Sequence, residues 1–134
     1  MGPIIVAYLM NFLGTPYMWG GDNAITGFDC SGLISEGLRS VGKCGKDRMT
    51  AQSIYDTIGK PTSLDVISEG TLLFFGKDFK NISHVAIAVN AFQMLESGGG
   101  GSSTVNDKEA GVNDAMVRIR PLSWRKDLIA AKAI

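Results

Sequence analysis

The sequence lacks most features that mark specialised classes of protein. Two cysteines and one histidine among 134 residues are too few for a disulfide scaffold or a zinc site. Thirteen basic side chains balance thirteen acidic ones, and no basic run is longer than Arg125-Lys126, so the charge pattern of a nucleic-acid-binding protein is missing. We therefore expect no metal, no organic cofactor and no nucleic-acid partner.

The N-terminal segment also lacks the features of a targeting signal. Residues 1–6 contain no basic cluster and no small-residue cleavage site, and the apolar run is broken at Asn11 and Gly14. These features predict neither a signal peptide nor a membrane span. An extracellular target would have to be reached through a larger parent protein, a larger secreted or phage-tail assembly, or a lysis system; otherwise we expect a cytoplasmic protein.

The length suits one domain over residues 1–134, large enough to bury about two thirds of its unfolded surface. Apolar periodicity and Gly/Pro stops predict helices and then strands. The expected helices cover 4–13, 30–41 and 50–58, and the expected strands cover 71–75, 84–89, 92–96, 116–120 and 128–134. The last segment is also compatible with a short helix, and we choose the strand. This order predicts an α+β fold with N-terminal helices packed on a meandering antiparallel sheet.

The stretch from Gly27 to Ile34 places a cysteine on the first turn of an apolar helix. Unpaired N–H groups and the positive end of the helix dipole favour the thiolate of Cys30, and the thiolate is the nucleophilic form. Asp29 is the expected N-cap, while Gly27 and a glycine at position 32 permit a tight turn and close packing. The alternative is a buried structural cysteine.

The single histidine, His84, lies at the start of an expected strand. A cysteine at a helix start and a histidine on a rigid strand form the minimal activated-thiol pair, although a lone histidine is also often structural. Glu96 follows twelve positions later, beyond a hairpin turn. An antiparallel neighbour strand can place its carboxylate beside His84, where it would orient the imidazole; the alternative is a solvated glutamate.

Other segments carry weaker signals. In the aromatic loop 15–23, the phenol of Tyr17 can donate a hydrogen bond to a developing oxyanion, while Trp19 is equally compatible with a core anchor. Cys44 is interpreted as a bystander in a loop. The glycine-rich segment 97–103 is either a mobile surface connection or a cleft wall. We expect Arg118 and Arg120 to point into water from an alternating strand.

Four segments together carry a resemblance. They are Gly14-Thr15-Pro16-Tyr17-Met18-Trp19-Gly20-Gly21, Phe28-Asp29-Cys30-Ser31-Gly32-Leu33, Gly70-Thr71-Leu72-Leu73-Phe74-Phe75 and His84-Val85-Ala86-Ile87-Ala88-Val89. In this order they resemble the NlpC-type family of papain-like cell-wall cysteine peptidases, and the match covers nearly the whole chain.

The resemblance implies a papain-like fold and a role for each matched residue. Cys30 would be the nucleophile, His84 the base and then the acid, and Tyr17 a neighbour of the oxyanion, with Asp29 and Ser31 also at the oxyanion or substrate. Members of the family cut stem peptides of bacterial murein, typically next to a γ-linked D-glutamate.

This sequence departs from the family at one proposed site residue. Glu96 stands where the family commonly has His, Asn or Gln, and its charge favours an imidazolium–thiolate ion pair. Glu96, followed after Ser97 by a run of four glycines, also resembles compact domains associated with bacteriophage tails.

Together these observations predict a cysteine hydrolase that cleaves peptide bonds in peptidoglycan stem peptides through an acyl-enzyme on Cys30. Two alternatives stay open. One is a murein amidase or acyltransferase that uses the same Cys–His pair. The other is a module that keeps the fold without turnover, as a wall-binding or phage-tail component.

Overall fold

The protein is described by a computed structural model over residues 1–98 and 115–134. Its helices, in chain order, are α1 (Gly2–Leu9), the 3-10 helix η1 (Met10–Phe12), α2 (Cys30–Ser40), α3 (Ala51–Thr57) and the 3-10 helix η3 (Leu122–Trp124). Its strands are β1 (Asp22–Asn23), β2 (Gly27–Phe28), β3 (Lys60–Thr62), β4 (Leu72–Gly76), β5 (Ile82–Ala88), β6 (Gln93–Gly98), β7 (Met116–Pro121) and β8 (Leu128–Ala133).

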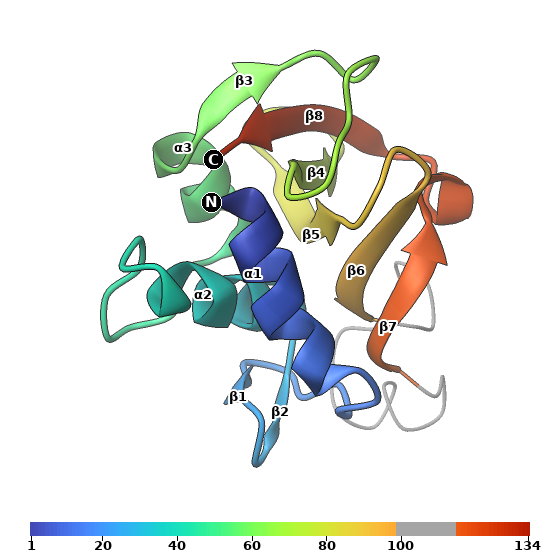
Figure 1. The fold of residues 1–134 in the computed structure, drawn as a ribbon. Helices are drawn as coiled ribbons and strands as arrows, with labels where there is room; N and C mark the ends of the chain where they lie inside the picture. The colour runs from blue at the N-terminus through green and yellow to red at the C-terminus, as the bar shows by residue number, and fades with distance from the viewer. Residues whose placement is uncertain (99–114) are drawn as a thin grey trace.

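The strands form one large sheet and one small hairpin. Within the described ranges, six strands lie in the order β3-β8-β4-β5-β6-β7, and every neighbouring pair is antiparallel. The run from β4 to β7 is the predicted meander, but β8 inserts between β3 and β4 (Figure 1). The α+β class is therefore confirmed, and the final segment is a strand as predicted.

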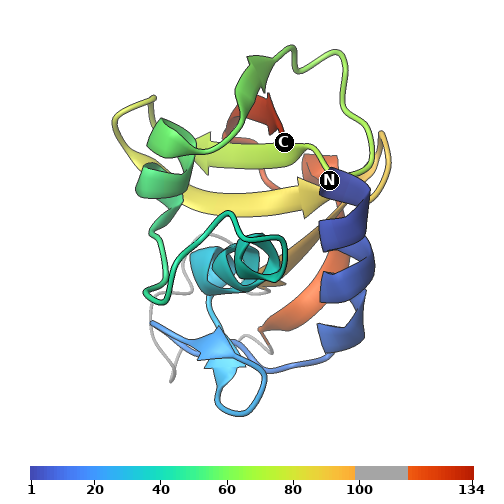
Figure 2. The same ribbon diagram turned by 60° about the vertical axis from the view of Figure 1, so that its left-hand side comes forward.

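The helices cover one face of this sheet, as the two ribbon views show (Figures 1 and 2). The main hydrophobic core lies between the helices α1, α2 and α3 and the strands β4, β5 and β6. Its fully buried side chains include Leu33, Ile54, Phe74 and Ile87. A smaller apolar cluster on the strands includes Leu73, Phe75 and Met94. Because successive strand residues point to opposite faces, β4 and β5 contribute to both clusters and are buried almost throughout.

The first helix is shorter than predicted. α1 ends at Leu9 and continues as a 3-10 turn. Ile5 and Leu9 are buried against α2, where Gly37 leaves room for them. Ile4 and Leu13, the two ends of the predicted helix, are instead 64% and 45% exposed.

The other predicted elements are found with shifted ends. Thr50 caps α3 through its side chain, as the sequence suggests. Ser97 and Gly98 belong to β6, so the segment 97–103 begins as strand, and residues 99–103 lie outside the described residues. The prediction of water-facing arginines in β7 is wrong: Arg118 and Arg120 are only partly exposed, and Arg118 pairs opposite the buried Glu96.

Within residues 1–98 and 115–134, no helix is both long enough and apolar enough to cross a membrane.

Candidate active site

Cys30 is the first residue of α2, and the preceding residue builds its surroundings. One carboxylate oxygen of Asp29 accepts the N–H of Gly32 at 2.7 Å, and the other accepts the N–H of Gly20 at 2.9 Å. The predicted N-cap is confirmed. Because the cap takes the third N–H of the helix, it does not occupy those of Cys30 and Ser31, which are the donors that a helix start offers to an anion.

The aromatic loop lies directly against this helix start. A Cβ on Gly32 would collide with the carbonyl oxygen of Gly21, so only glycine permits the approach. Gly27 has a φ of 121°, in a region that favours glycine, and a Cβ there would collide with the Pro16 carbonyl and the Met18 side chain. The two glycines therefore fix the loop that contains Tyr17 and Trp19 beside Cys30.

His84 comes from β5, the central strand next to α2. Phe75 pairs with His84 but Gly76 pairs with Ile82, so the register shifts and Ser83 is an extra residue on β5. Such a bulge redirects the side chains beside it. It lies immediately before His84, which is third in the strand rather than first.

A side chain of α3 fixes the approach to this bulge. The amide oxygen of Gln52 accepts the N–H of Ile82 at 2.8 Å, and its NH₂ donates to the carbonyl of Phe79 at 3.0 Å. Gln52 thus holds the β4–β5 connection at two points just before His84. The sequence analysis missed this residue, because nothing local connects a helix glutamine to a strand 30 positions away.

Glu96 lies beside the imidazole. Its Oε1 is 2.6 Å from Nε2 of His84, and the residues are 2% and 6% exposed. An ionised carboxylate can only accept, so Nε2–H is the donor and Nδ1 is the nitrogen left for Cys30. The predicted position of Glu96 is confirmed, and the solvated alternative is wrong; its catalytic role stays a prediction.

The three groups shift one another's protonation. Burial raises the pKa of the Cys30 thiol, but the charge and hydrogen bond of His84 outweigh it and leave that pKa lowered. Burial opposes the charged form of His84 as well, yet the Cys30 thiolate and then Glu96 raise its pKa to about 9. The pKa of Glu96 is lowered against its burial, chiefly by the hydrogen bond from His84. These shifts favour the thiolate–imidazolium form of the pair.

Arg48 is a second residue that the sequence analysis missed. It forms an ion pair with Asp29 at 2.5 Å and donates to the hydroxyl of the buried Ser31. Arg48 lies in the α2–α3 connection, where no periodic pattern singles it out. Asp29 and Ser31 line the cavity as expected, but each is already bonded to Arg48, so these three side chains form one polar wall.

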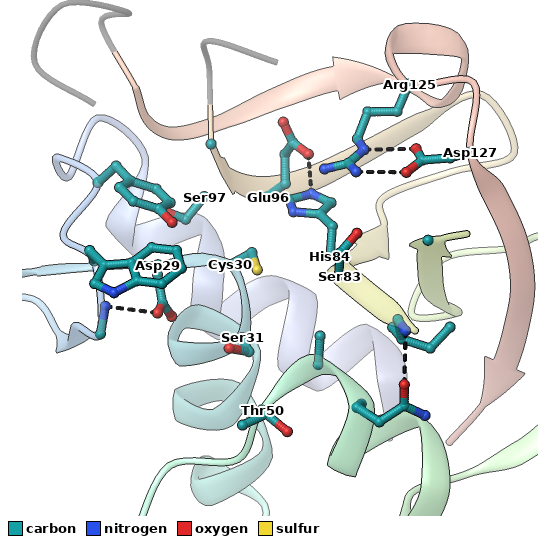
Figure 3. A pocket seen from close by; sticks show the side chains of 18 of the residues that line it. Asp29, Cys30, Ser31, Thr50, Ser83, His84, Glu96, Ser97, Arg125 and Asp127 are labelled. Atoms are coloured by element: carbon teal, nitrogen blue, oxygen red, sulfur yellow. Dashed lines mark hydrogen bonds and ion pairs between the residues drawn. The ribbon is translucent and has the colours of Figure 1, made fainter. Parts of the chain in front are cut away.

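Arg125 and Asp127 form another ion pair, on the side of His84 that is away from Cys30 (Figure 3). Two guanidinium nitrogens of Arg125 donate to the two carboxylate oxygens of Asp127 at 2.9 and 2.7 Å. Both residues follow η3 and precede β8. In the sequence Arg125 is only half of a short basic pair.

A cavity of about 790 Å³ opens onto these groups. That volume is within the usual range for small-molecule sites. Tyr17, Trp19 and Trp124 line it together with Cys30 and the polar residues described above. Trp19 is 58% exposed, so its interpretation as a core anchor is wrong.

Cys44 lies apart from these groups. Neither Cys30 nor Cys44 is in a disulfide. Sγ of Cys44 donates a weak hydrogen bond to the carbonyl of Asp47 in its own loop. Across residues 1–98 and 115–134, no three His, Cys, Asp or Glu side chains converge in a way that would hold a metal ion.

Comparison with known proteins gives one consistent family. Residues 14–121 match the NlpC/P60 family. The chain is 36% identical over 94 residues to the bifunctional muramidase/DL-endopeptidase CwlT of Bacillus subtilis, covering 69% of this chain and 28% of CwlT. It is 30% identical over 90 residues to the murein DD-endopeptidase MepH of Escherichia coli, covering 66% of this chain and 33% of MepH. The chain thus spans about a third or less of these relatives.

Solved structures agree with the sequence comparison. The NlpC/p60 domain of the peptidoglycan hydrolase SagA superposes with a TM-score of 0.76 at 26% identity, over 100% of this chain and 99% of that domain. A Staphylococcus aureus protein described as similar to an NLP/P60 lipoprotein superposes with a TM-score of 0.74 at 26% identity, over 99% of this chain and 41% of that one. The expected papain-like architecture is confirmed.

Proposed function

Since this chain belongs to the NlpC/P60 family, we propose that it is a cysteine peptidase that hydrolyses amide bonds in the stem peptides of bacterial peptidoglycan. The observation that carries the proposal is the hydrogen bond between His84 and Glu96, in a cavity where the imidazolium also lowers the pKa of Cys30. A nucleophile, a base and a group that orients the base are the parts that acyl transfer needs.

In the acylation step, the Cys30 thiolate attacks the amide carbon. The oxyanion receives hydrogen bonds from the N–H groups at the start of α2, and we assign a further one to the phenol of Tyr17, which lines the same cavity. As the C–N bond breaks, Nδ1–H of His84 protonates the departing amine. The product is a thioester on Cys30 and a free amine.

In the deacylation step, His84 acts as the base. The thioester no longer holds a negative sulfur beside the ring, so the imidazole is neutral more often than in the resting enzyme. It accepts a proton from water as the water oxygen attacks the thioester carbon. The C–S bond breaks, the thiolate–imidazolium pair forms again, and the peptide leaves as a carboxylic acid that gives its proton to the solvent.

The substrate class follows from the relatives rather than from the cavity alone. CwlT is named a DL-endopeptidase and MepH a murein DD-endopeptidase, and both names specify bonds that involve D-residues. We extend to this chain their shared feature, an amide bond of a murein peptide. A murein amidase or an acyltransferase with the same Cys–His pair would also form a thioester on Cys30. The amidase would differ in the bond attacked and thus in the acyl group, and the acyltransferase would differ in the acceptor.

We further propose that residues 1–134 form one catalytic domain that is brought to the cell wall by a larger protein or assembly, a bacteriophage tail among them. Support comes from the curated relatives, of which this chain covers about a third or less. Purification with interacting proteins from the native source would test this; recovery of the chain alone, neither fused nor bound, would contradict it.

The experiment for the catalytic proposal is digestion of purified peptidoglycan, followed by mass spectrometry of the soluble products. We expect fragments with a new amine and a new carboxylate within the stem peptide, and none with Cys30→Ala. A new end at the bond between glycan and peptide would instead identify an amidase. Intact substrate with a folded protein whose Cys30 reacts with alkylating reagents no faster than an ordinary thiol would favour a non-catalytic module.

A further inference from the structure

The guanidinium of Arg125 is held from two directions. Asp127 binds it in a bidentate pair, and the guanidinium carbon lies 5.3 Å from the centre of the Phe75 ring. The side chain of Arg125 is only 11% exposed. The Phe75 ring also lies beside the imidazole of His84, with ring centres 5.3 Å apart. Arg125 is therefore fixed beside the His84–Glu96 pair, and Figure 3 shows it on the side of Glu96.

This placement creates an alternating row of charges. Asp127 is negative, Arg125 positive, Glu96 negative and His84 positive in the resting enzyme. The charge of Arg125, followed by that of Arg120, helps to lower the pKa of Glu96. The bidentate geometry and the burial of Arg125 hold its guanidinium in one place, although the side chain of Asp127 is 38% exposed.

Other charged groups face the same pair and must be considered. They come from α2, the α2–α3 connection, the β4–β5 connection and β7, and they are Cys30, Asp29, Arg48, Lys77, Arg118 and Arg120. Of these, Arg120 also acts on Glu96, but its guanidinium lies 3.9 Å from the centre of the Trp124 ring. Arg125 has a larger effect on the pKa of Glu96 than Arg120 has, and its partner Asp127 also interacts with His84.

We propose that Arg125, held by Asp127 and the Phe75 ring, is a positioning residue that acts through Glu96: it keeps that carboxylate ionised and in place, and it limits how firmly the carboxylate retains the proton on His84. The catalytic consequence rests on the proposed function. An uncompensated buried glutamate would favour the imidazolium in both steps, whereas deacylation requires the neutral imidazole as a base. Arg125 offsets part of the field of Glu96 and so makes a glutamate suitable at this position.

The test uses the fact that the chain has one histidine. The proton on Cε1 of its ring gives one NMR signal of that kind, so a pH titration reports His84 without assignment and without substrate. We choose a Cys30→Ala background, which removes the thiolate as acylation does. In this background, Arg125→Gln should raise the pKa of His84 by about half a unit or more, because it removes only the positive charge. The glutamine amide keeps a donor for the carboxylate of Asp127.

Three controls separate charge from structure. Arg125→Lys keeps the charge and should leave the titration close to that of the background. Arg125→Met with Asp127→Asn removes both charges, and it should shift the titration upward by less than Arg125→Gln, because the loss of Asp127 opposes the effect; it provides a second variant if Arg125→Gln fails to fold. With Glu96→Gln added, Arg125→Gln should no longer shift His84, because the charge through which Arg125 acts is gone.

The kinetic counterpart uses the enzyme with Cys30 intact. In Arg125→Gln the acid limb of kcat should move to higher pH, with accumulation of the thioester at neutral pH. An unchanged His84 titration in the charge-removing variants, or the same shift with Gln at position 96, would overturn the proposal. Because the titration needs no substrate, it can support or refute this role even if the peptidoglycan experiment fails.

Discussion

Replacement of Glu96 by glutamine changes the site by one charge and almost no volume. The amide oxygen of the variant can still accept Nε2–H of His84, so the ring stays oriented. What disappears is a negative charge that is 2.6 Å from the imidazole in a position only 2% exposed. Glu96→Gln therefore isolates the charge of the carboxylate from its shape.

The size of the effect follows from the kind of hydrogen bond that is lost. A hydrogen bond to a charged group typically contributes about 1.5 to 3 kcal/mol and a neutral one roughly 1 kcal/mol. The difference is about 1 to 2 kcal/mol, and a tenfold change in rate corresponds to about 1.4 kcal/mol. We therefore expect kcat/KM to fall on the order of tenfold in Glu96→Gln. Glu96→Ala should lose more, because the ring also becomes free to rotate.

The pH dependence gives the sign of the same effect. Cys30 and then Glu96 raise the pKa of His84 to about 9, so the alkaline limb of kcat/KM, where the imidazolium loses its proton, should lie near pH 9 in the wild type. Without the charge of Glu96 that limb moves toward neutral pH. The acid limb moves upward, because a weaker imidazolium stabilises the Cys30 thiolate less.

The assay is hydrolysis of a purified stem peptide between pH 5 and 10 by the wild type, Glu96→Gln and Glu96→Ala. A bell-shaped profile of kcat/KM against pH that becomes narrower on both its acid and its alkaline side in Glu96→Gln would support the reasoning. If Glu96→Ala matched the wild type in rate and profile, the contact between Glu96 and His84 would have no role in turnover.

Three further outcomes are expected. Cys30→Ala should abolish hydrolysis, while Cys44→Ala should keep most of the rate; comparable losses in the two variants would contradict the choice of nucleophile. Iodoacetamide should alkylate Cys30 rapidly well below the pKa of an ordinary thiol, because the helix start and the imidazolium favour the thiolate, and His84→Ala should slow this reaction across pH 5 to 8; equal rates would rule out coupling. Gly32→Ala should lower the free energy of unfolding in urea by about 1 to 3 kcal/mol, since its Cβ would collide with backbone, whereas Gly45→Ala, where a Cβ has open space, should change it little.

The sequence was informative wherever a local rule determines the structure. The helix start at Cys30 could be predicted because Asp29 is a strong N-cap and glycines allow the approach of the preceding loop. The buried strands β4 and β5 could be predicted from apolar runs between turn signals. The position of Glu96 was a weaker inference, since it needed the pairing of β5 with β6, and a register shift of one residue would have put the carboxylate on the other face.

The parts that sequence reasoning missed depend on contacts between distant segments. Arg48 reaches Asp29 across the α2–α3 connection, and Gln52 binds the loop before His84 from a different element. Arg125 is near the site only because β8 inserts beside β4. The insertion of β8 cannot be deduced from periodicity, which specifies the face of a strand but not its neighbours. The alternation of arginines in β7 wrongly predicted water-facing side chains for the same reason. Periodicity does not show that the neighbouring strand β6 places Glu96 opposite Arg118.

The central claim is that hydrolysis proceeds through an acyl group on Cys30, and nucleophile competition tests it most directly. A purified stem peptide is digested with increasing hydroxylamine, and the products are identified by mass spectrometry. The acyl-enzyme mechanism predicts that the acyl half appears partly as a hydroxamate, in a share that rises with hydroxylamine, and that Cys30→Ala gives neither acid nor hydroxamate. Cleavage that persists in Cys30→Ala would contradict the account.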